Sequence, residues 1–336
     1  FTVNLETPLT HSEIPIDKYG STIKADPSVA QFLKDIGVNL VALANNHILD
    51  FGGNGLEDTM RACQELGMDT VGAGLSLKDA CKLYIKKFPE FTLGVINITE
   101  REFSCARPGH AGANPLTLTH LLRLIESGTK QVDHLLLIIH GGLENVHFPS
   151  PQSVTTFRYL AEQGVSAIIR HHSHRVQGYE VWKGVPIFYG IAHFMFDWYS
   201  PVYGADLDGL MVRLNFAGKG DCDFNCIPIR YTRERPYLKI LTGDEKTNYI
   251  KQIDSWSSIL KDPVKLEQKW QEITAEKKAV YMALLSLPNR FAIRVMNRLG
   301  ILHLFRPSKF HRRIIENYIR CDAHREMLQM IFEEER

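Results

Sequence analysis

Between Asp26 and Arg170 the chain alternates between segments with helical hydrophobic spacing and short segments that are almost wholly apolar. The first helix-like segment opens with Asp26 and Pro27, an acidic cap followed by proline, and stops near Gly37. Helices that alternate with largely apolar strands indicate a sheet covered on its faces. We therefore expect an α/β domain. Its predicted strands include residues 38–43, 68–71, 93–98, 132–139 and 165–169.

Beyond Arg170 the predicted strands are joined by turns such as Lys183-Gly184, a pattern that favours antiparallel pairing. We assign residues 1–245 to one α/β domain. From about Asp262 onward the chain lacks strand signals, so residues 262–336 are expected to form a helical C-terminal extension. The predicted helices of this extension are residues 265–285, 289–304 and 307–335, with breaks near Pro288 and Pro307.

Basic residues are concentrated in the predicted extension, where Arg290, Arg294 and Arg298 are spaced by four and share a helix face. Such a helix can lie on an anionic membrane surface or on a partner protein. Alternatively, it is a solvated face of a helix that packs on its own domain. The formal net charge of the whole chain is only +1, which does not suggest a nucleic-acid partner. No run of about 18 uncharged apolar residues predicts a transmembrane helix.

Three of the apolar strands run directly into segments that carry histidine. In open α/β sheets, ligands bind beyond the carboxyl ends of the strands. We therefore expect these histidines to meet in one site at that edge of the sheet. The three segments are Ala44-Asn45-Asn46-His47-Ile48-Leu49-Asp50, His140-Gly141-Gly142-Leu143-Glu144 and Arg170-His171-His172-Ser173-His174.

Imidazole nitrogens combined with carboxylate and amide oxygens suit zinc, manganese or iron. His172 and His174 are two residues apart, so they share a face if the segment is extended and can serve two neighbouring metal ions if it is a loop. A nucleophilic triad is the competing chemistry, but no serine or cysteine lies in a Gly-x-Ser-x-Gly turn. No phosphate-binding loop or dinucleotide fingerprint occurs either. The pattern therefore favours a metal site.

These segments resemble the CapA family, the poly-γ-glutamate capsule synthesis proteins, which is related in fold to the calcineurin-like metallophosphoesterases. The matching segments follow the family's order over most of residues 1–200, and their combination is highly specific, whereas the helical extension is not covered. They are Asn4-Leu5-Glu6-Thr7-Pro8-Leu9-Thr10, Ala44-Asn45-Asn46-His47-Ile48-Leu49-Asp50-Phe51-Gly52, Val71-Gly72-Ala73-Gly74, His140-Gly141-Gly142-Leu143-Glu144, Pro149-Ser150-Pro151, His171-His172-Ser173-His174-Arg175-Val176-Gln177-Gly178 and Pro186-Ile187-Phe188-Tyr189.

The resemblance implies a four-layer α/β/β/α sandwich of the metallophosphoesterase type that lacks its first strand. In the family that strand carries an aspartate ligand, and it would lie before Phe1. The resemblance also implies two divalent metal ions, with manganese, zinc or iron as candidates, and Glu6 in the place of the carboxylate that bridges them. The metal ligands that it implies are Glu6, Asn46, His140, His172 and His174.

The mechanism that the resemblance implies is two-metal hydrolysis, in which a water with a lowered pKa attacks an ester or amide centre. His47 resembles the histidine that contacts the phosphate or protonates the leaving group, a task that imidazole suits near neutral pH. Asp50 either orients His47 or caps a helix or turn. Glu144 is either a group near the metals and substrate or an acid of a surface loop. We take His47, Asp50 and Glu144 as the candidate catalytic residues.

Two residues near the expected site depart from the family's pattern. Arg170 stands where the family usually has glycine, and His193 where it usually has asparagine. We expect both, together with Gln177, to bind substrate. Arg170 would pair with a phosphate or carboxylate of the substrate, or else form an ordinary ion pair.

Two functions are therefore expected from the sequence. The first is a metal-dependent hydrolase that acts on a phosphoester, or on the amide of an anionic polymer, in capsule or poly-γ-glutamate synthesis. The second is an accessory or scaffold protein of capsule assembly that binds metal or polymer without turnover. The family suggests the cell envelope or a membrane-associated location, while a cytoplasmic one stays open.

Overall fold

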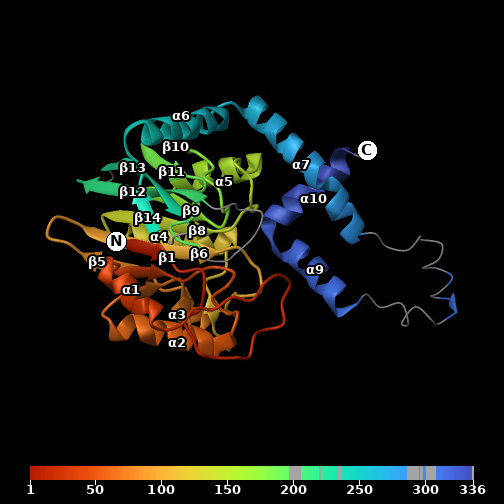
Figure 1. Ribbon diagram of the computed structural model, residues 1–336, viewed down its shortest axis with the longest axis horizontal. Coiled ribbons are helices and arrows are strands. Elements are labelled where there is room, and N and C mark those ends of the chain that lie inside the picture. The colour runs from red at the N-terminus through yellow and green to blue at the C-terminus, as the bar shows by residue number, and fades with distance from the viewer. Residues whose placement is uncertain are drawn as a thin grey trace.

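The computed structural model describes residues 1–196, 206–218, 221–232, 237–285, 295, 298–299 and 308–334. It confirms the mixed α/β class, because helices alternate with parallel strands as far as residue 171. Figure 1 shows helices α1 (Val29–Asp35) and α2 (Gly52–Glu65) on one side of the central strands and α6 (Gly243–Leu260) on the other.

The strands that the alternation assigns to one sheet are divided between two. A three-stranded parallel sheet has the order β1-β2-β3, and a six-stranded sheet has the order β10-β11-β9-β8-β6-β5. The inner strands of the large sheet run parallel, while β5 and β10 pair antiparallel at its edges. The bounds are β1 (Thr2–Asn4), β2 (Leu40–Ala42), β3 (Asp69–Val71), β5 (Tyr84–Lys87), β6 (Thr92–Thr99), β8 (His134–His140), β9 (Ala167–His171), β10 (Tyr179–Trp182) and β11 (Val185–Phe188).

Separate apolar clusters hold these sheets and helices together. Leu40 and Val71 of the small sheet pack against Leu136 and Ile138 of the large one, so the two sheets face each other. The outer face of the small sheet carries α1 and α2, and that of the large sheet carries α4 (Leu118–Thr129) and α5 (Pro151–Ala161). The finer expectation, a metallophosphoesterase-type sandwich, stays a prediction.

The chain after residue 200 adds an antiparallel sheet, which the sequence predicted, and helix α6, which it did not. Strands β12 (Asp206–Ala217), β13 (Asp221–Thr232) and β14 (Tyr237–Ile240) form the sheet, as the turns after Arg170 suggested. Helix α6 begins at Gly243, so the helical part of the chain starts earlier than the expected residue 262. Leu210, Tyr249 and Ile253 bury this region against the large sheet.

The last helices are α7 (Pro263–Leu285), α9 (Lys309–Arg320) and α10 (Asp322–Glu334), which Figure 1 shows together beside the sheets. The predicted helix 289–304 lies almost wholly outside the described residues, as do Arg290 and Arg294. Among the described helices, none combines the length and apolar character needed to span a membrane. The division into domains at 1–245 and 262–336 stays a prediction.

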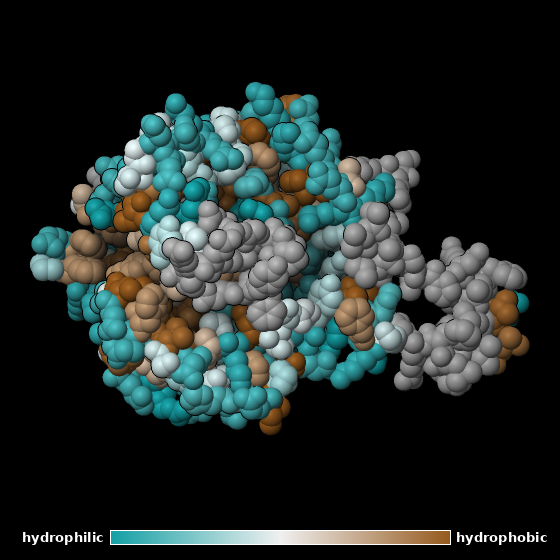
Figure 2. Space-filling model, viewed as in Figure 1, coloured by the Kyte–Doolittle hydropathy of each residue, from teal (hydrophilic) through white to brown (hydrophobic). Residues whose placement is uncertain are grey.

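The hydropathy of the surface is that expected when each helix buries one face and exposes the other. Figure 2 shows mainly hydrophilic residues over α6 at the top of the view and over α2 at the bottom. Helix α2 buries Leu56 and Cys63 while its opposite side is exposed. The remaining short elements are β4 (Ala73–Gly74), α3 (Leu77–Ala80) and β7 (Gly112–Ala113).

Candidate metal centre

A large cavity of about 1580 Å³ extends along β1, β8 and β12 and reaches beyond the carboxyl ends of strands from both sheets. The loops after β1, β2, β8 and β9 all contribute to it, because parallel strands end at the same edge of a sheet. The three histidine segments therefore converge as expected, although they arrive from two facing sheets and not from the rim of one.

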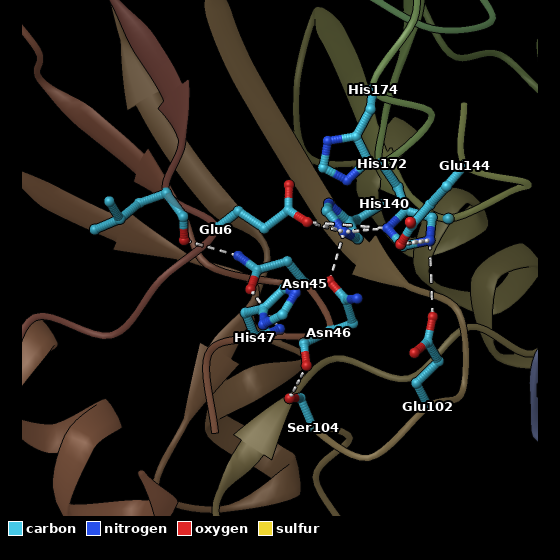
Figure 3. Close-up of polar contacts among 12 residues, drawn as sticks. Glu6, Asn45, Asn46, His47, Glu102, Ser104, His140, Glu144, His172 and His174 are labelled. Carbon is cyan, nitrogen blue, oxygen red and sulfur yellow. Dashed lines mark hydrogen bonds and ion pairs between the residues drawn. The ribbon is translucent and has the colours of Figure 1, made fainter. Parts of the chain in front are cut away.

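Glu6, His140 and His172 form the first group of candidate metal ligands, with one donor atom from each lying within 4.8 Å of the others. Figure 3 shows the Glu6 carboxylate pointing toward the two imidazoles. Glu6 Oε1 lies 3.4 Å from Nε2 of His140 and 3.9 Å from Nδ1 of His172. Each side chain is placed by a strand: Glu6 follows β1, His140 is the last residue of β8, and His172 comes directly after β9.

Glu144, His172 and His174 form the second group, again with donor atoms within 4.8 Å of one another. His172 is common to both groups. The backbone φ angles of His172 and His174 are +89° and +54°, in the left-handed region that few L residues adopt. The segment is therefore a loop, and this backbone strain is of the kind found at functional sites.

The protonation of the site follows from burial and from its carboxylates. Burial lowers the pKa of His140 to about 4, so this imidazole is neutral near pH 7. Burial also acts against protonated His172, but its hydrogen bond with Glu6 and the charges of Glu144 and Glu102 outweigh that effect and raise its pKa to about 9. Burial acts to raise the pKa of Glu6, yet the neighbouring imidazoles lower it well below its usual range, so Glu6 is a carboxylate.

Asn46 lies beside the first group through its side-chain amide. Its Oδ1 is 3.0 Å from Nε2 of His140. Its backbone carbonyl accepts a 2.6 Å hydrogen bond from the hydroxyl of Ser104, which fixes the loop after β2 (Figure 3). The neighbouring Asn45 ties the same loop to β1 by donating to the Leu5 carbonyl at 2.8 Å.

His47 lines the same cavity and is held by a buried carboxylate. Its Nδ1 lies 2.6 Å from Oδ2 of Asp50, whose side chain is fully buried. Asp50 also pairs with the ammonium group of Lys18 and accepts a 2.8 Å hydrogen bond from the backbone N–H of Ile23. Its side chain does not cap α2, since Phe51 holds the N-cap position without a side-chain hydrogen bond. This geometry matches an orienting role for Asp50.

Two residues that the sequence analysis did not single out lie in the cavity with these groups. Lys18 reaches Asp50 and lies 3.2 Å from Nδ1 of His47. Glu102 has Oε1 3.8 Å from Nε2 of His172, and Figure 3 shows its carboxylate directed toward that ring. Burial raises the pKa of Glu102, with the charges of the nearby acids adding to the effect. Glu102 follows β6, so the strand-end rule applied to this strand would have found it.

The three expected substrate-binding residues differ in their positions. His193 lines the cavity, with Nε2 3.1 Å from Nδ1 of His174. Arg170 does not line it: its buried guanidinium donates to the Gly141 carbonyl at 2.6 Å and lies over the ring of Phe157. Gln177 is likewise buried outside the cavity and donates to a backbone carbonyl. Both therefore support neighbouring loops here, and any contact of theirs with substrate stays a prediction.

The chemistry of the donor set fits divalent metal ions. Each group combines one carboxylate with two imidazoles, the ligands that zinc, manganese and iron accept. His140 is neutral near pH 7, as a ligand must be, whereas His172, whose pKa is about 9 without metal, would release a proton on binding an ion. Its buried Nδ1 has no hydrogen-bond partner within the part of the chain that the structure describes.

Comparison with known families gives one match by family model, over residues 1–198, to a family described as "Bacterial capsule synthesis protein PGA_cap". A solved structure that overlaps 64% of this chain and 70% of its own has a TM-score of 0.34 and 10% identity, too low to carry an argument about fold.

Three curated relatives are similar at the level of sequence. Capsule biosynthesis protein CapA of Bacillus anthracis is 26% identical over 220 residues, which are 64% of this chain and 53% of that protein. PGA biosynthesis protein CapA of Bacillus subtilis is 27% identical over 232 residues, 67% of this chain and 60% of that protein. A probable polyglutamine synthesis accessory protein of Mycobacterium tuberculosis is 26% identical over 252 residues, 69% and 66% of the two chains. The chain thus spans little more than half the length of the first two.

Proposed function

Since the chain belongs to the bacterial capsule synthesis protein family PGA_cap, we propose that it is a metal-dependent hydrolase of capsule or poly-γ-glutamate synthesis. The reaction is hydrolysis of a phosphoester or of an amide in an anionic polymer, on a metallophosphoesterase-type sandwich. The observation that carries the proposal is the convergence of carboxylates and imidazoles from separate strand ends into two groups that share His172.

In this proposal one set of residues holds the metal ions and another transfers protons. Glu6, His140 and His172 would hold one divalent ion, with Asn46 beside them, and Glu144, His172 and His174 a second. Ions in such a site supply Lewis acidity and make water a nucleophile near neutral pH. His47, oriented by Asp50, gives a proton to the leaving group. Burial of these groups keeps bulk water from competing for their hydrogen bonds.

The test begins with metal binding to the full chain. Wild type is titrated with Mn²⁺ in a calorimeter and checked by elemental analysis. His172→Asn removes a donor from both groups, so we expect its Mn²⁺ affinity to fall by more than the roughly 10–100-fold that follows loss of a supporting partner. His174→Asn touches only the second group and should keep one ion. His11→Asn, at an exposed position, is the matched control. A wild-type protein that binds no metal would refute the proposal.

Turnover is tested with p-nitrophenyl phosphate and with γ-glutamyl p-nitroanilide, each with added Mn²⁺. These two substrates separate phosphoester from amide hydrolysis. His47→Ala should lower the rate about 10²–10⁴-fold, the usual contribution of a positioned acid, without loss of bound metal.

A second candidate function is an accessory protein of polymer synthesis that binds metal or polymer without turnover. The name of the Mycobacterium tuberculosis relative favours it. Bound metal without hydrolysis of either substrate would support this alternative. Contact of the basic helices with a membrane or a partner is a weaker part of it, because Lys309 and Arg313 both pair with Asp17 of the same chain. Co-sedimentation with anionic liposomes tests that contact directly.

A further inference from the structure

The C-terminal helices form one wall of the cavity that holds the candidate metal ligands. Lys277 and Tyr281 of α7, Asn317 and Tyr318 of α9, and His324 of α10 line it together with His172 and Glu144. The match to the family model ends at residue 198, so this wall lies outside it.

Contacts with the site loops fix the wall in place. Leu143 and Val146, which flank Glu144, share a buried cluster with Trp270, Tyr281 and Tyr318. Arg320 donates to the Glu102 carbonyl at 3.3 Å, and the Cys321 thiol lies 3.1 Å from a carboxylate oxygen of Glu100. The helices thus contact the loops that carry Glu102 and Glu144, both of which lie near His172.

Lys277 offers this wall a positive charge. Within the described residues its ammonium group has no ion pair or hydrogen bond, whereas the Lys269 ammonium on the same helix lies 2.7 Å from Glu272. A lysine that lines a cavity without a protein partner is placed to bind an anion.

His324 offers the same wall a neutral donor. The Tyr281 hydroxyl is hydrogen bonded to Nδ1 of His324. Burial lowers the pKa of His324 to about 4, so its ring carries one proton near pH 7. Burial also raises the pKa of Tyr281, so its hydroxyl keeps its proton and can donate to Nδ1, in the tautomer that has the ring proton on Nε2.

We propose that α7, α9 and α10 form a subsite that binds an anionic oxygen group of the substrate, a carboxylate or a phosphate, through Lys277 and the neutral donor His324. The inference rests on the proposed function, because it names the substrate class of the same cavity. Lys277 and His324 line the same cavity as Glu6 and His172, so a ligand that contacts both sets of residues carries an anionic group apart from the bond that is cleaved. An anionic polymer has such groups along its whole length.

The experiment measures binding of two probes to the full chain by calorimetry, inorganic phosphate and tetra-γ-glutamate, with Mn²⁺ and again in EDTA. Lys277→Met should weaken binding of at least one probe about tenfold or more, the loss expected for a charge-assisted hydrogen bond. Lys277→Arg keeps the charge and should stay within about threefold of wild type. The probe that loses more identifies the group as carboxylate or phosphate.

Lys269→Met is the matched control, since this lysine lies on the same helix but does not line the cavity. It should leave the affinity for both probes unchanged. Equal affinity of Lys277→Met and wild type, or no probe binding to wild type in either condition, would overturn the subsite. Absence of Mn²⁺ binding would instead overturn the hydrolase, while the comparison in EDTA still decides the subsite.

Discussion

At the turn after β8, Gly142 allows a buried arginine to approach the backbone, and Gly141 makes room for Glu100. Gly142 has a φ of +104°, and a Cβ atom there would lie 1.5 Å from Nη2 of Arg170. A Cβ atom at Gly141 would lie 2.4 Å from Cγ of Glu100. The guanidinium of Arg170 therefore packs against this turn and supports it. The turn leads directly to Glu144. The absence of a side chain at Gly142 leaves the space that the Arg170 guanidinium occupies.

We expect Gly142→Ala to destabilise the protein more than Gly184→Ala. Both positions have φ in the left-handed region, at +104° and +86°, so each alanine bears about 1–2 kcal/mol of backbone strain. Only Gly142 also meets a neighbour, which adds about 1–3 kcal/mol of overpacking. Urea unfolding of both variants measures the difference. Equal losses would show that Arg170 moves aside without cost.

The residues of the site were predictable where a motif or a strand end marks them. Glu6, His140, His172 and His174 lie in segments shared with the family. Glu6, His172 and His174 line one cavity, and Nε2 of His140 lies 3.4 Å from Glu6. Lys18 was not predictable in this way, because it lies in a loop and meets His47 and Asp50 only through the fold. The sequence also did not predict that Arg170 lies outside the cavity. The alternation of side chains along a strand does not determine the direction of a long side chain at the strand end.

At the scale of elements, the C-terminal helices contact the catalytic loops through one apolar cluster. Met327 of α10 is fully buried in this cluster, which also contains Leu143 and Val146 of the Glu144 loop. The position of Glu144 therefore depends on helices far away in the sequence. Loops that lack such contacts open more readily.

We expect Met327→Ala to loosen the Glu144 loop while the small sheet stays protected. Removal of a buried methionine side chain costs about 2–5 kcal/mol and leaves a cavity between α10 and the loop. Hydrogen exchange of the backbone amides at Leu143 and Val146 should accelerate, with little change in β2. Phe332→Ala, at a 45% exposed position on the same helix, is the control and should change neither. Unchanged exchange in Met327→Ala would show that the loop is held independently of the helices.

Element types followed from the sequence more readily than their pairing. Apolar runs predicted β2, β6, β8 and β9, but their residues do not say which strand pairs with which, so the division into two sheets was expected from the family resemblance alone. Helix α6 was missed although Tyr249, Ile253 and Leu260 repeat at helical spacing, and two acids follow its N-cap. The helix is polar overall, so its amphipathic pattern was overlooked in the sequence. The structure shows that Tyr249, Ile253 and Leu260 are buried.

At the scale of the whole molecule, buried neutral histidines couple stability to pH. Burial lowers the pKa of His140, His171 and His324 to about 4 each, against about 6.5 in an unfolded chain. Between these values the unfolded chain binds protons that the native state does not, so the free energy of unfolding rises with pH. This stabilisation is complete above about pH 6.5 and is lost as pH falls toward 4. His172 acts in the opposite sense: its stabilisation without metal is lost as pH rises toward 9.

His324 allows this coupling to be tested away from the metal ligands. The groups that affect its pKa, after burial itself, are Glu100, His172, Glu144 and Lys277, and Tyr281 is its hydrogen-bond partner. In EDTA, the free energy of unfolding of wild type falls between pH 6.5 and pH 5. We expect that fall to be about 2 kcal/mol smaller in His324→Phe, since the interval covers 1.5 pH units at about 1.4 kcal/mol each. Urea unfolding at the two pH values measures this slope. The lost hydrogen bond to Tyr281 lowers the free energy of unfolding equally at the two pH values, so it does not change the slope. His11→Phe, at an exposed position, is the control and should keep the wild-type slope. If His324→Phe also keeps the wild-type slope, His324 is protonated in the native state and cannot be the neutral donor of the anion subsite.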